Sequence, residues 1–288
     1  MKIKDILQNN KVTVSFEVFP PKEWAKLADT KKVIEQMVKF NPAFMSVTYG
    51  ASGTTSGYTT EIANAIMKGG VTPLSHLTCL TSSREKIDSV LDELKDNGVE
   101  NILALRGDIP KDFVESKGQD FHHAYELIDI IRARGGFCIG GACYPETHPE
   151  SKNRVEDIAM LKHKVDCGLD FLTTQMFFDN EKLYEFREMC AIKEINVPII
   201  AGIMPITNAA QIKRSIELSN CSLPKKFEKI MERFGDNPDA MKQAGIIYAT
   251  EQIIDLMANG INNIHIYTMN KPDIAEKIMK GLSSIIDE

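Results

Sequence analysis

The stretch VTVSFEVFPPK, residues 12–22, decides the fold that this sequence encodes. The run VTVSFEV is of β type, and side chains alternate across a strand, so Val14 and Phe16 share one face while Ser15 and Glu17 share the other. The two prolines end the run, because proline cannot donate a hydrogen bond to a neighbouring strand. A carboxylate inside such a run is costly to bury unless it is paired, solvated or protonated. Glu17 therefore indicates either an exposed edge or a chemical task.

Seven further apolar runs of strand length follow along the chain. They are FMSVTY (44–49), PLSHLTC (73–79), NILALR (101–106), FCIGGACY (137–144), FLTTQMF (171–177), VPIIAGI (197–203) and NNIHIYT (262–268). Segments of helical character separate them, and in the clearest, 82–98, Ser82 and Glu85 fit a capping box. The gap before the last run is longer and has room for an extra helix or two. Eight strands alternating with helices predict a single (β/α)8 barrel, a TIM barrel, as the catalytic domain over residues 1–288.

An open, doubly wound sheet is the alternative arrangement of the same elements. Such sheets carry a GxGxxG turn after the first strand when they bind dinucleotides. The sequence has no such turn at that place, which favours the closed barrel.

Composition excludes several classes of function. The chain has 288 residues, 43% of them hydrophobic, which suffices for a large buried core. The formal net charge is −6, and no basic run of the kind that binds nucleic acid is present. No apolar stretch approaches the roughly 20 residues that span a bilayer, and MKIKDILQNN lacks the apolar segment of a signal peptide. We expect a cytoplasmic protein without a nucleic-acid or membrane partner.

The six cysteines give no sign of a metal centre. They form no CxxC pair and no Cys/His cluster with zinc-ligand spacing. We expect reduced, mostly buried thiols and predict no metal site.

Glu17 stands at the place where a barrel performs its chemistry, the carboxyl end of a strand. It ends the inward face of the first run, at the mouth of the predicted barrel. A carboxyl group that is partly desolvated there should have a raised pKa and could act as a general acid. An ion pair with a neighbouring arginine or lysine is the alternative, and geometry alone does not choose between the two.

Other polar residues stand at the ends of later runs. In ALRGD, Gly107 lets the backbone approach a ligand closely, whereas Asp108 could simply pair with Arg106 as a structural bridge. His76 lies in an apolar run, where a core histidine with satisfied hydrogen bonds is the more common case. Gln175 would need partners if buried, and the edge of a heterocyclic ligand is one candidate.

A set of segments, in a fixed order, carries a resemblance to a known family. They are FEVFPPK, SVTYGA, HLTC, ALRGD, YPETHPE, LKHKVDCG, TTQMFFD, AGIMPI and IHIYTMN, from about residue 14 to 270. Each segment alone would be a weak signal, but the ordered set is specific. The chain resembles 5,10-methylenetetrahydrofolate reductase of the bacterial type.

The resemblance implies a flavin-containing (β/α)8 barrel that usually holds FAD. An enzyme of this kind transfers a hydride from NADH or NADPH, through flavin N5, to 5,10-methylenetetrahydrofolate and so forms 5-methyltetrahydrofolate. Nicotinamide and folate use the same flavin face in turn, which implies ping-pong kinetics. The family also suggests a homo-oligomer.

Carried over to this sequence, the resemblance implies roles for individual residues. Glu17 matches the general acid, which protonates the folate as its five-membered ring opens to an iminium cation. Asp108 matches an aspartate beside flavin and pterin, whose negative charge helps to stabilise that cation. Gln175 matches a glutamine that hydrogen-bonds the pterin, and Thr48 matches a position near the flavin ring and the substrate. The other matched cofactor positions are His76, Leu105, Arg106, Gly107, Ala124, Tyr144, His148, Asp157 and Lys164.

Three positions depart from the family pattern. Many relatives place an aromatic residue after AGIMPI that stacks on nicotinamide or on the aryl ring of folate, and the nearest position here is Ala209. This departure leaves open the same folate chemistry with electrons supplied by a partner subunit of an electron-transfer complex. His123 and Met160 replace a tyrosine and an asparagine near the adenosine half of the cofactor, so FMN stays open beside FAD.

A competing function is that of a barrel lyase or methyltransferase without flavin. Such an enzyme would need a Schiff-base lysine or a metal cluster at a strand end.

Overall fold

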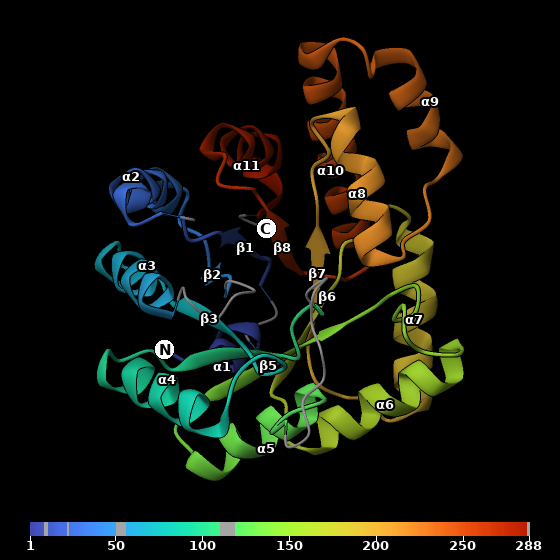
Figure 1. Cartoon of the computed structure of the whole chain (residues 1–288). Coiled ribbons are helices and arrows are strands. Elements are labelled where there is room, and N and C mark those ends of the chain that lie inside the picture. The colour runs from blue at the N-terminus through green and yellow to red at the C-terminus, as the bar shows by residue number, and fades with distance from the viewer. Residues whose placement is uncertain (9–10, 22, 50–55, 110–118, 287–288) are drawn as a thin grey trace.

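The computed structural model describes residues 1–8, 11–21, 23–49, 56–109 and 119–286. Eight parallel strands pair in sequence order, and pairing of the last strand with the first closes them into a barrel (Figure 1). The strands are β1 (Thr13–Val18), β2 (Met45–Val47), β3 (Pro73–Thr78), β4 (Asn101–Leu105), β5 (Cys138–Cys143), β6 (Phe171–Thr174), β7 (Ile199–Ile203) and β8 (Asn263–Tyr267). The predicted (β/α)8 barrel is confirmed.

Except for α1, which precedes β1, the helices follow the strands around the outside of the barrel, as Figure 1 shows. They are α1 (Ile3–Leu7), α2 (Leu27–Met37), α3 (Ser56–Lys68), α4 (Arg84–Asp96), α5 (Ala124–Arg134), α6 (Arg154–Asp166), α7 (Asn180–Ile192), α8 (Ala209–Ser219), α9 (Lys225–Phe234), α10 (Pro238–Ala258) and α11 (Pro272–Ile286), with short 3-10 helices η1 (Trp24–Lys26) and η2 (Val38–Phe40). The predicted extra helices are present, because α8 and α9 precede α10 between β7 and β8. In Figure 1 these three helices project together at one side of the barrel, and they share a hydrophobic cluster that includes Phe227 and Met241.

The start of α4 differs by one residue from the predicted capping box. Ser83, not Ser82, is the N-cap, and its side chain accepts a hydrogen bond from the backbone N–H of Lys86 at 3.2 Å. Ser82 is buried, and its hydroxyl donates to the carbonyl of Thr78 at 3.4 Å. Two adjacent serines offer the same capping chemistry, so the preceding turn decides which of them caps the helix.

The strands separate two apolar environments. Outward side chains such as Val14 and Phe16 pack against the helices in the largest hydrophobic cluster. Inward side chains form a second cluster inside the barrel: Ile3, Leu7, Phe44, Leu74, Leu103, Cys138, Phe171 and Ile200. The alternation predicted along β1 is therefore confirmed.

Helix α1 closes the N-terminal end of the barrel. Ile3 and Leu7 are buried in the inner cluster. Asn101, at the start of β4, fixes the helix by accepting a hydrogen bond from the backbone N–H of Ile3 at 2.8 Å and by donating to the carbonyl of Pro73 at 3.2 Å. The sequence prediction missed this helix, because five residues carry too little periodicity to be recognised.

The register between strands arranges the inward side chains in levels, each built from alternate strands. The level of Glu17 takes one residue from each odd-numbered strand: Glu17, His76, Ala142 and Gly202. The level above it, at the mouth, consists of Thr48, Leu105, Gln175 and Tyr267. The two levels below Glu17 consist of Ser46, Leu103, Thr173 and His265, and then of Ser15, Leu74, Gly140 and Ile200. The lowest of these four levels thus has one polar side chain, and each of the three levels above it has two or three.

Candidate active site

Glu17 and His76 lie side by side inside the barrel, just below its mouth. Glu17 Oε2 is 3.6 Å from His76 Nε2, and each residue is only 7% exposed. Burial raises the pKa of the Glu17 carboxyl to about 8 and lowers the pKa of the His76 imidazole to about 3. Both groups are therefore neutral near pH 7, and Glu17 has a proton to give.

The alternative prediction for Glu17, an ion pair with arginine or lysine, is wrong within the described residues. There, the titratable side chain that the structure places next to the Glu17 carboxyl group is His76. The usual expectation for His76, a core histidine with satisfied hydrogen bonds, is also wrong, because its buried Nε2 has no hydrogen-bond partner in the described part of the chain.

A second buried histidine, His265, lies one level lower and is fully hydrogen-bonded. Its Nδ1 is 2.7 Å from Ser15 Oγ and its Nε2 is 3.0 Å from Ser46 Oγ. The Ser15 hydroxyl donates to the carbonyl of Ile264 at 3.0 Å, so it accepts from Nδ1–H, and Ser46 then donates to Nε2. Burial lowers the pKa of His265 to about 3, so this network is neutral. The sequence analysis missed it, because it joins β1, β2 and β8.

Tyr267 forms part of the floor of the mouth. Its hydroxyl donates to the carbonyl of Thr174 at 2.6 Å, across the intervening strand β7. This hydrogen bond across β7 requires glycine at position 202, because a Cβ atom there would lie 2.4 Å from the Tyr267 hydroxyl oxygen. Burial, reinforced by Glu17, keeps the pKa of Tyr267 well above its ordinary value, so the hydroxyl remains a donor.

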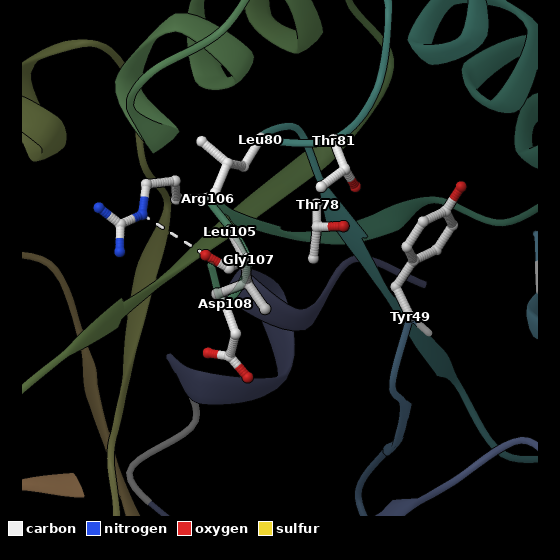
Figure 2. A pocket seen from close by; sticks show the side chains of 8 residues that line it. All are labelled: Tyr49, Thr78, Leu80, Thr81, Leu105, Arg106, Gly107 and Asp108. Carbon is white, nitrogen blue, oxygen red and sulfur yellow. Dashed lines mark hydrogen bonds between the residues drawn. The ribbon is translucent and has the colours of Figure 1, made fainter. Parts of the chain in front are cut away.

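A cavity of about 140 Å³ opens beside the mouth, at the ends of β2, β3 and β4 (Figure 2). Its lining residues are Tyr49, Thr78, Leu80, Thr81, Leu105, Arg106, Gly107 and Asp108. Gly107 has φ of +93°, and a Cβ atom there would lie 3.0 Å from Thr78 Cβ, so the loop needs glycine at this position. The carbonyl of Arg106 accepts from the backbone N–H of Leu80 at 2.9 Å, which fastens the loop to the end of β3. The close approach of a ligand to the backbone at Gly107 stays a prediction.

Arg106 and Asp108 leave this loop in different directions, as Figure 2 shows. Arg106 makes a two-pronged pair with Glu150, Nη1 to Oε2 at 2.5 Å and Nη2 to Oε1 at 2.7 Å. That pair raises the pKa of Arg106 and lowers the pKa of Glu150. Asp108 is exposed and has no ion pair or hydrogen bond in the described ranges, so the alternative of an Arg106–Asp108 bridge is wrong there.

The predicted residues after β5 form a third group. The rings of Tyr144 and His148 meet edge to face, with centroids 4.6 Å apart, and burial raises the pKa of the Tyr144 phenol while Gln175 opposes that rise. His148 Nδ1 accepts from the backbone N–H of Glu150 at 3.1 Å, which places the ring proton on Nε2. Burial lowers the pKa of His148, so the imidazole is a neutral donor. Glu150 joins this group to the β4 loop through Arg106.

Asp157 and Lys164, both on α6, support that group from below. The Asp157 carboxylate accepts from the backbone N–H of His148 at 3.1 Å and from the Ser151 hydroxyl at 3.0 Å. The Lys164 ammonium group donates to the carbonyl of Ala142. Burial lowers the pKa of Lys164, although Asp157 opposes this change.

A comparison with protein families decides where this chain belongs. A family model described as methylenetetrahydrofolate reductase matches residues 2–283. The chain belongs to the methylenetetrahydrofolate reductase family. It is 36% identical to 5,10-methylenetetrahydrofolate reductase of Buchnera aphidicola, over 94% of this chain and 91% of that protein. It is also 36% identical to methylenetetrahydrofolate reductase (NADH) 1 of Arabidopsis thaliana, over 100% of this chain and 51% of the plant protein. The chain thus spans about half the length of the plant relatives that it matches.

A solved structure supports the fold in addition. An uncharacterized protein from Clostridium thermocellum, which binds two copies of 5-methyl-5,6,7,8-tetrahydrofolic acid, superimposes with a TM-score of 0.67. The alignment covers 100% of this chain and 99% of that protein at 13% sequence identity. At this identity the similarity concerns the barrel fold.

The positions that depart from the methylenetetrahydrofolate reductase pattern lie outside the barrel interior. His123 is the exposed N-cap of α5, directly before Ala124, and its carbonyl accepts from the Cys79 thiol at 3.6 Å. Met160 is 45% exposed on α6. Ala209 is the first residue of α8, directly after the N-cap Asn208.

Several residues that shape the site received no role from the sequence. These are Tyr49, Thr78, Leu80 and Thr81 in the cavity wall, Glu150 beside Arg106, and Tyr267 with Gly202 at the floor. Tyr49, Thr78 and Tyr267 stand at strand ends, so their position was a usable signal. The partner of Arg106 was not readable, because it lies 44 residues further along the chain.

Proposed function

We propose that this chain reduces 5,10-methylenetetrahydrofolate to 5-methyltetrahydrofolate, with a hydride that comes from NADH or NADPH through flavin N5 in a ping-pong reaction. The observation that carries the proposal is the buried Glu17 carboxyl at the mouth of the barrel, whose pKa of about 8 leaves it protonated at neutral pH. Membership of the methylenetetrahydrofolate reductase family supports the choice of substrate.

Glu17 would act as the general acid. Reduction of the methylene bridge requires the five-membered ring of the folate to open, and the nitrogen that leaves must take up a proton. An acid with a pKa near the working pH is well suited to this step, because it is protonated at rest and gives up its proton at small cost. The residues above Glu17 in the mouth, Thr48 and Gln175, would then contact the folate.

Asp108 would stabilise the cation that ring opening creates. Its carboxylate is exposed at the rim of the cavity. The nearest arginine, Arg106, is neutralised by Glu150, so the negative charge of Asp108 is not consumed by an ion pair with it. A fixed charge at the place where positive charge develops lowers the barrier of that step.

Gln175 would read the edge of the pterin. Its Oε1 accepts from the backbone N–H of Met176 at 2.9 Å. This contact orients the amide at the level above Glu17. A fixed amide can pair with the donor and acceptor atoms along a heterocycle.

The residues beside the mouth fit a flavin. Gly107 provides a backbone surface without a side chain, Leu80 and Leu105 provide apolar walls, and His148 and Arg106 provide donors for polar groups. Lys164 is a buried ammonium group with a single carbonyl acceptor in the described residues, which suits it to a further anionic or carbonyl partner. A bound flavin would supply the hydride chemistry that the side chains of the protein lack. FAD and FMN both remain compatible with these residues, with Thr48, Ala124 and Asp157 completing the set.

The test begins with the visible spectrum of the purified protein after incubation with FAD or FMN. Anaerobic NADH or NADPH should bleach the flavin band, and 5,10-methylenetetrahydrofolate should then restore it. A flavin that neither nicotinamide reduces, but that folate reoxidises after chemical reduction, would move the electron source to a partner subunit. Failure of folate to restore the band of the reduced protein would contradict the proposal.

The remaining proposals concern the electron source, the oligomeric state and the cellular location of the protein. Ala209 motivates the alternative of a partner-supplied electron source, because an aromatic side chain is absent from that position. In the described part of the chain no helix is long and apolar enough to cross a membrane. We also propose a homo-oligomer in the cytoplasm, which gel filtration of the purified protein and fractionation of its host cells would test.

A further inference from the structure

We propose that His76 is a positioning residue for Glu17, and that its neutral imidazole donates a hydrogen bond from Nε2–H to the carbonyl oxygen of the protonated Glu17 carboxyl group. The hydrogen bond would hold the acid in one orientation and leave its O–H free to face the substrate. Its kinetic consequence rests on the proposed function, whereas the hydrogen bond itself does not.

The first argument is the composition of the level that contains Glu17. Of its four residues, Ala142 and Gly202 have no polar side-chain atom, so Glu17 and His76 are the polar pair of that level. The two come from β1 and β3, which are not neighbours in the sheet, and they meet above Ser46 of β2. Their separation of 3.6 Å needs only a small side-chain adjustment to become a hydrogen bond.

The second argument is the contrast between the two buried histidines. Both ring nitrogens of His265 have hydroxyl partners, Ser15 and Ser46. Nε2 of His76 is equally inaccessible and has no hydrogen-bond partner in the described part of the chain. Buried polar atoms are nearly always paired, so an unpaired nitrogen that faces a carboxyl group calls for that group as its partner.

The third argument is the charge state of the surroundings. A neutral carboxyl and imidazole hold the same number of protons as a carboxylate and an imidazolium, so the environment decides between the two pairs. Within the described ranges, the groups that face the pair are Tyr267 and His265 from β8 and Ser46 from β2. The Tyr267 hydroxyl donates to Thr174, and His265 and Ser46 bond to one another, so none of them offsets a charge. Burial without a counter-charge favours the neutral pair.

Nuclear magnetic resonance of the flavin-free protein tests the hydrogen bond directly. In protein labelled with ¹⁵N-histidine, with His76 assigned through His76→Gln, we expect Nε2 protonated and Nδ1 unprotonated at pH 7. Both nitrogen shifts should change near pH 8, as Glu17 titrates, and this change should vanish in Glu17→Gln. His265 should show no change near pH 8 in either protein. A doubly protonated His76 at pH 7, or shifts that ignore the titration of Glu17, would overturn the proposal.

Kinetics test the positioning role. His76→Leu should slow reoxidation of the reduced flavin by folate by about 10- to 30-fold, which corresponds to the loss of one hydrogen bond to the acid. His76→Gln, whose amide N–H can still place a donor near the position of Nε2, should restore the rate to within about fivefold. Reduction of the flavin by nicotinamide should stay within about threefold in both variants.

The matched control is Thr173→Val, an isosteric change at a buried inward residue one level lower. Its hydroxyl has no hydrogen-bond partner in the described residues, so its removal should leave both half-reactions unchanged. Equal slowing of both half-reactions in His76→Leu would assign His76 to flavin contact and overturn the positioning role. If the unmodified protein does not react with folate, the proposed function fails, while the magnetic resonance result still decides the hydrogen bond.

Discussion

The two ends of the barrel interior follow the same alternation of side chains but have opposite chemistry. At the N-terminal end, Phe171, Leu74 and Ile200 fill the space and α1 closes it. At the mouth, Glu17 and His76 share a level with Ala142 and Gly202, whose small size leaves room. Burial of apolar side chains at the first end stabilises the fold, whereas at the second end polar groups take the place of apolar packing. The comparison predicts that changes at the closed end affect folding and changes at the mouth affect chemistry.

The largest expected effect is that of Glu17→Gln on the reaction with folate. We expect that half-reaction to slow by about 10³- to 10⁴-fold, the upper range for a general acid, because glutamine has no acidic proton. Flavin reduction by nicotinamide needs no acid and should be nearly unchanged. Anaerobic stopped-flow absorbance of each half-reaction measures both rates. Equal damage to the two would remove Glu17 from the role of acid.

The same substitution should stabilise the protein at alkaline pH. The folded state raises the pKa of Glu17 from an ordinary 4.5 to about 8, so it holds the proton more tightly than the unfolded chain does. Wild-type stability is therefore full below pH 4.5 and falls as the pH rises to about 8, while Glu17→Gln lacks this loss. The variant should gain roughly 1.4 kcal/mol per pH unit over this range, on the order of 4–5 kcal/mol in total.

Urea unfolding of both proteins between pH 5 and 9 provides the measurement for that prediction. The pKa values of His76 and His265 are lowered by burial, so their contribution is present above pH 6.5 and is lost as the pH falls toward 3. Above pH 6.5 neither histidine contributes a change, so the difference between the two proteins there reports the titration of Glu17. A difference that does not change with pH would show that Glu17 is already ionised in the folded state.

At the closed end, Phe171→Ala should lower the free energy of unfolding by about 4 kcal/mol, because it opens a cavity in a fully packed region. The rate constants of the folded protein should change by less than about threefold, since Phe171 lies below the levels that we propose to contact substrate. Urea unfolding and stopped-flow absorbance on the same preparation separate the two effects. A large loss of rate with unchanged stability would contradict the assignment of stability to the closed end and of chemistry to the mouth.

The smallest effect concerns Asp108→Asn at the rim of the mouth. We expect folate reduction to slow by about tenfold, because a neutral amide stabilises the cation less than a carboxylate does. Flavin should still bind, and stability should change by less than about 0.5 kcal/mol, since the side chain is exposed and has no ion pair in the described residues. Flavin titration by fluorescence checks the first point. Loss of flavin binding would reassign Asp108 to the cofactor.

The sequence predicted the barrel because the fold depends on patterns that repeat along the chain. Eight apolar runs and the alternation from Val14 to Glu17 locate the strands and their inward faces without knowledge of any contact. The predictions failed in two kinds of place. The helix α1 is too short to be recognised, and Ser82 and Ser83 are equally good N-cap residues for α4. Local sequence carries too little information to decide either case.

The site was predictable in its residue types and not in its pairings. Glu17, Asp108 and Gln175 could be located at strand ends, because barrel topology places them there. The partners of Arg106 and His265 could not, since Glu150, Ser15 and Ser46 meet them only after the chain closes. The resemblance supplied roles that periodicity does not contain, and those roles await the experiments above.

The contacts between β1 and β8 determine when the Glu17 carboxyl group becomes protonated. Ser15 and Glu17 bond to residues about 250 positions further along the chain, His265 to the hydroxyl and Thr268 to the carbonyl. Synthesis delivers β8 last, so the compartment around Glu17 is incomplete while most of the chain already exists. Until then the carboxyl group remains hydrated and ionised at neutral pH. The proton that we propose Glu17 gives to the folate would thus be acquired as the final strand closes the ring.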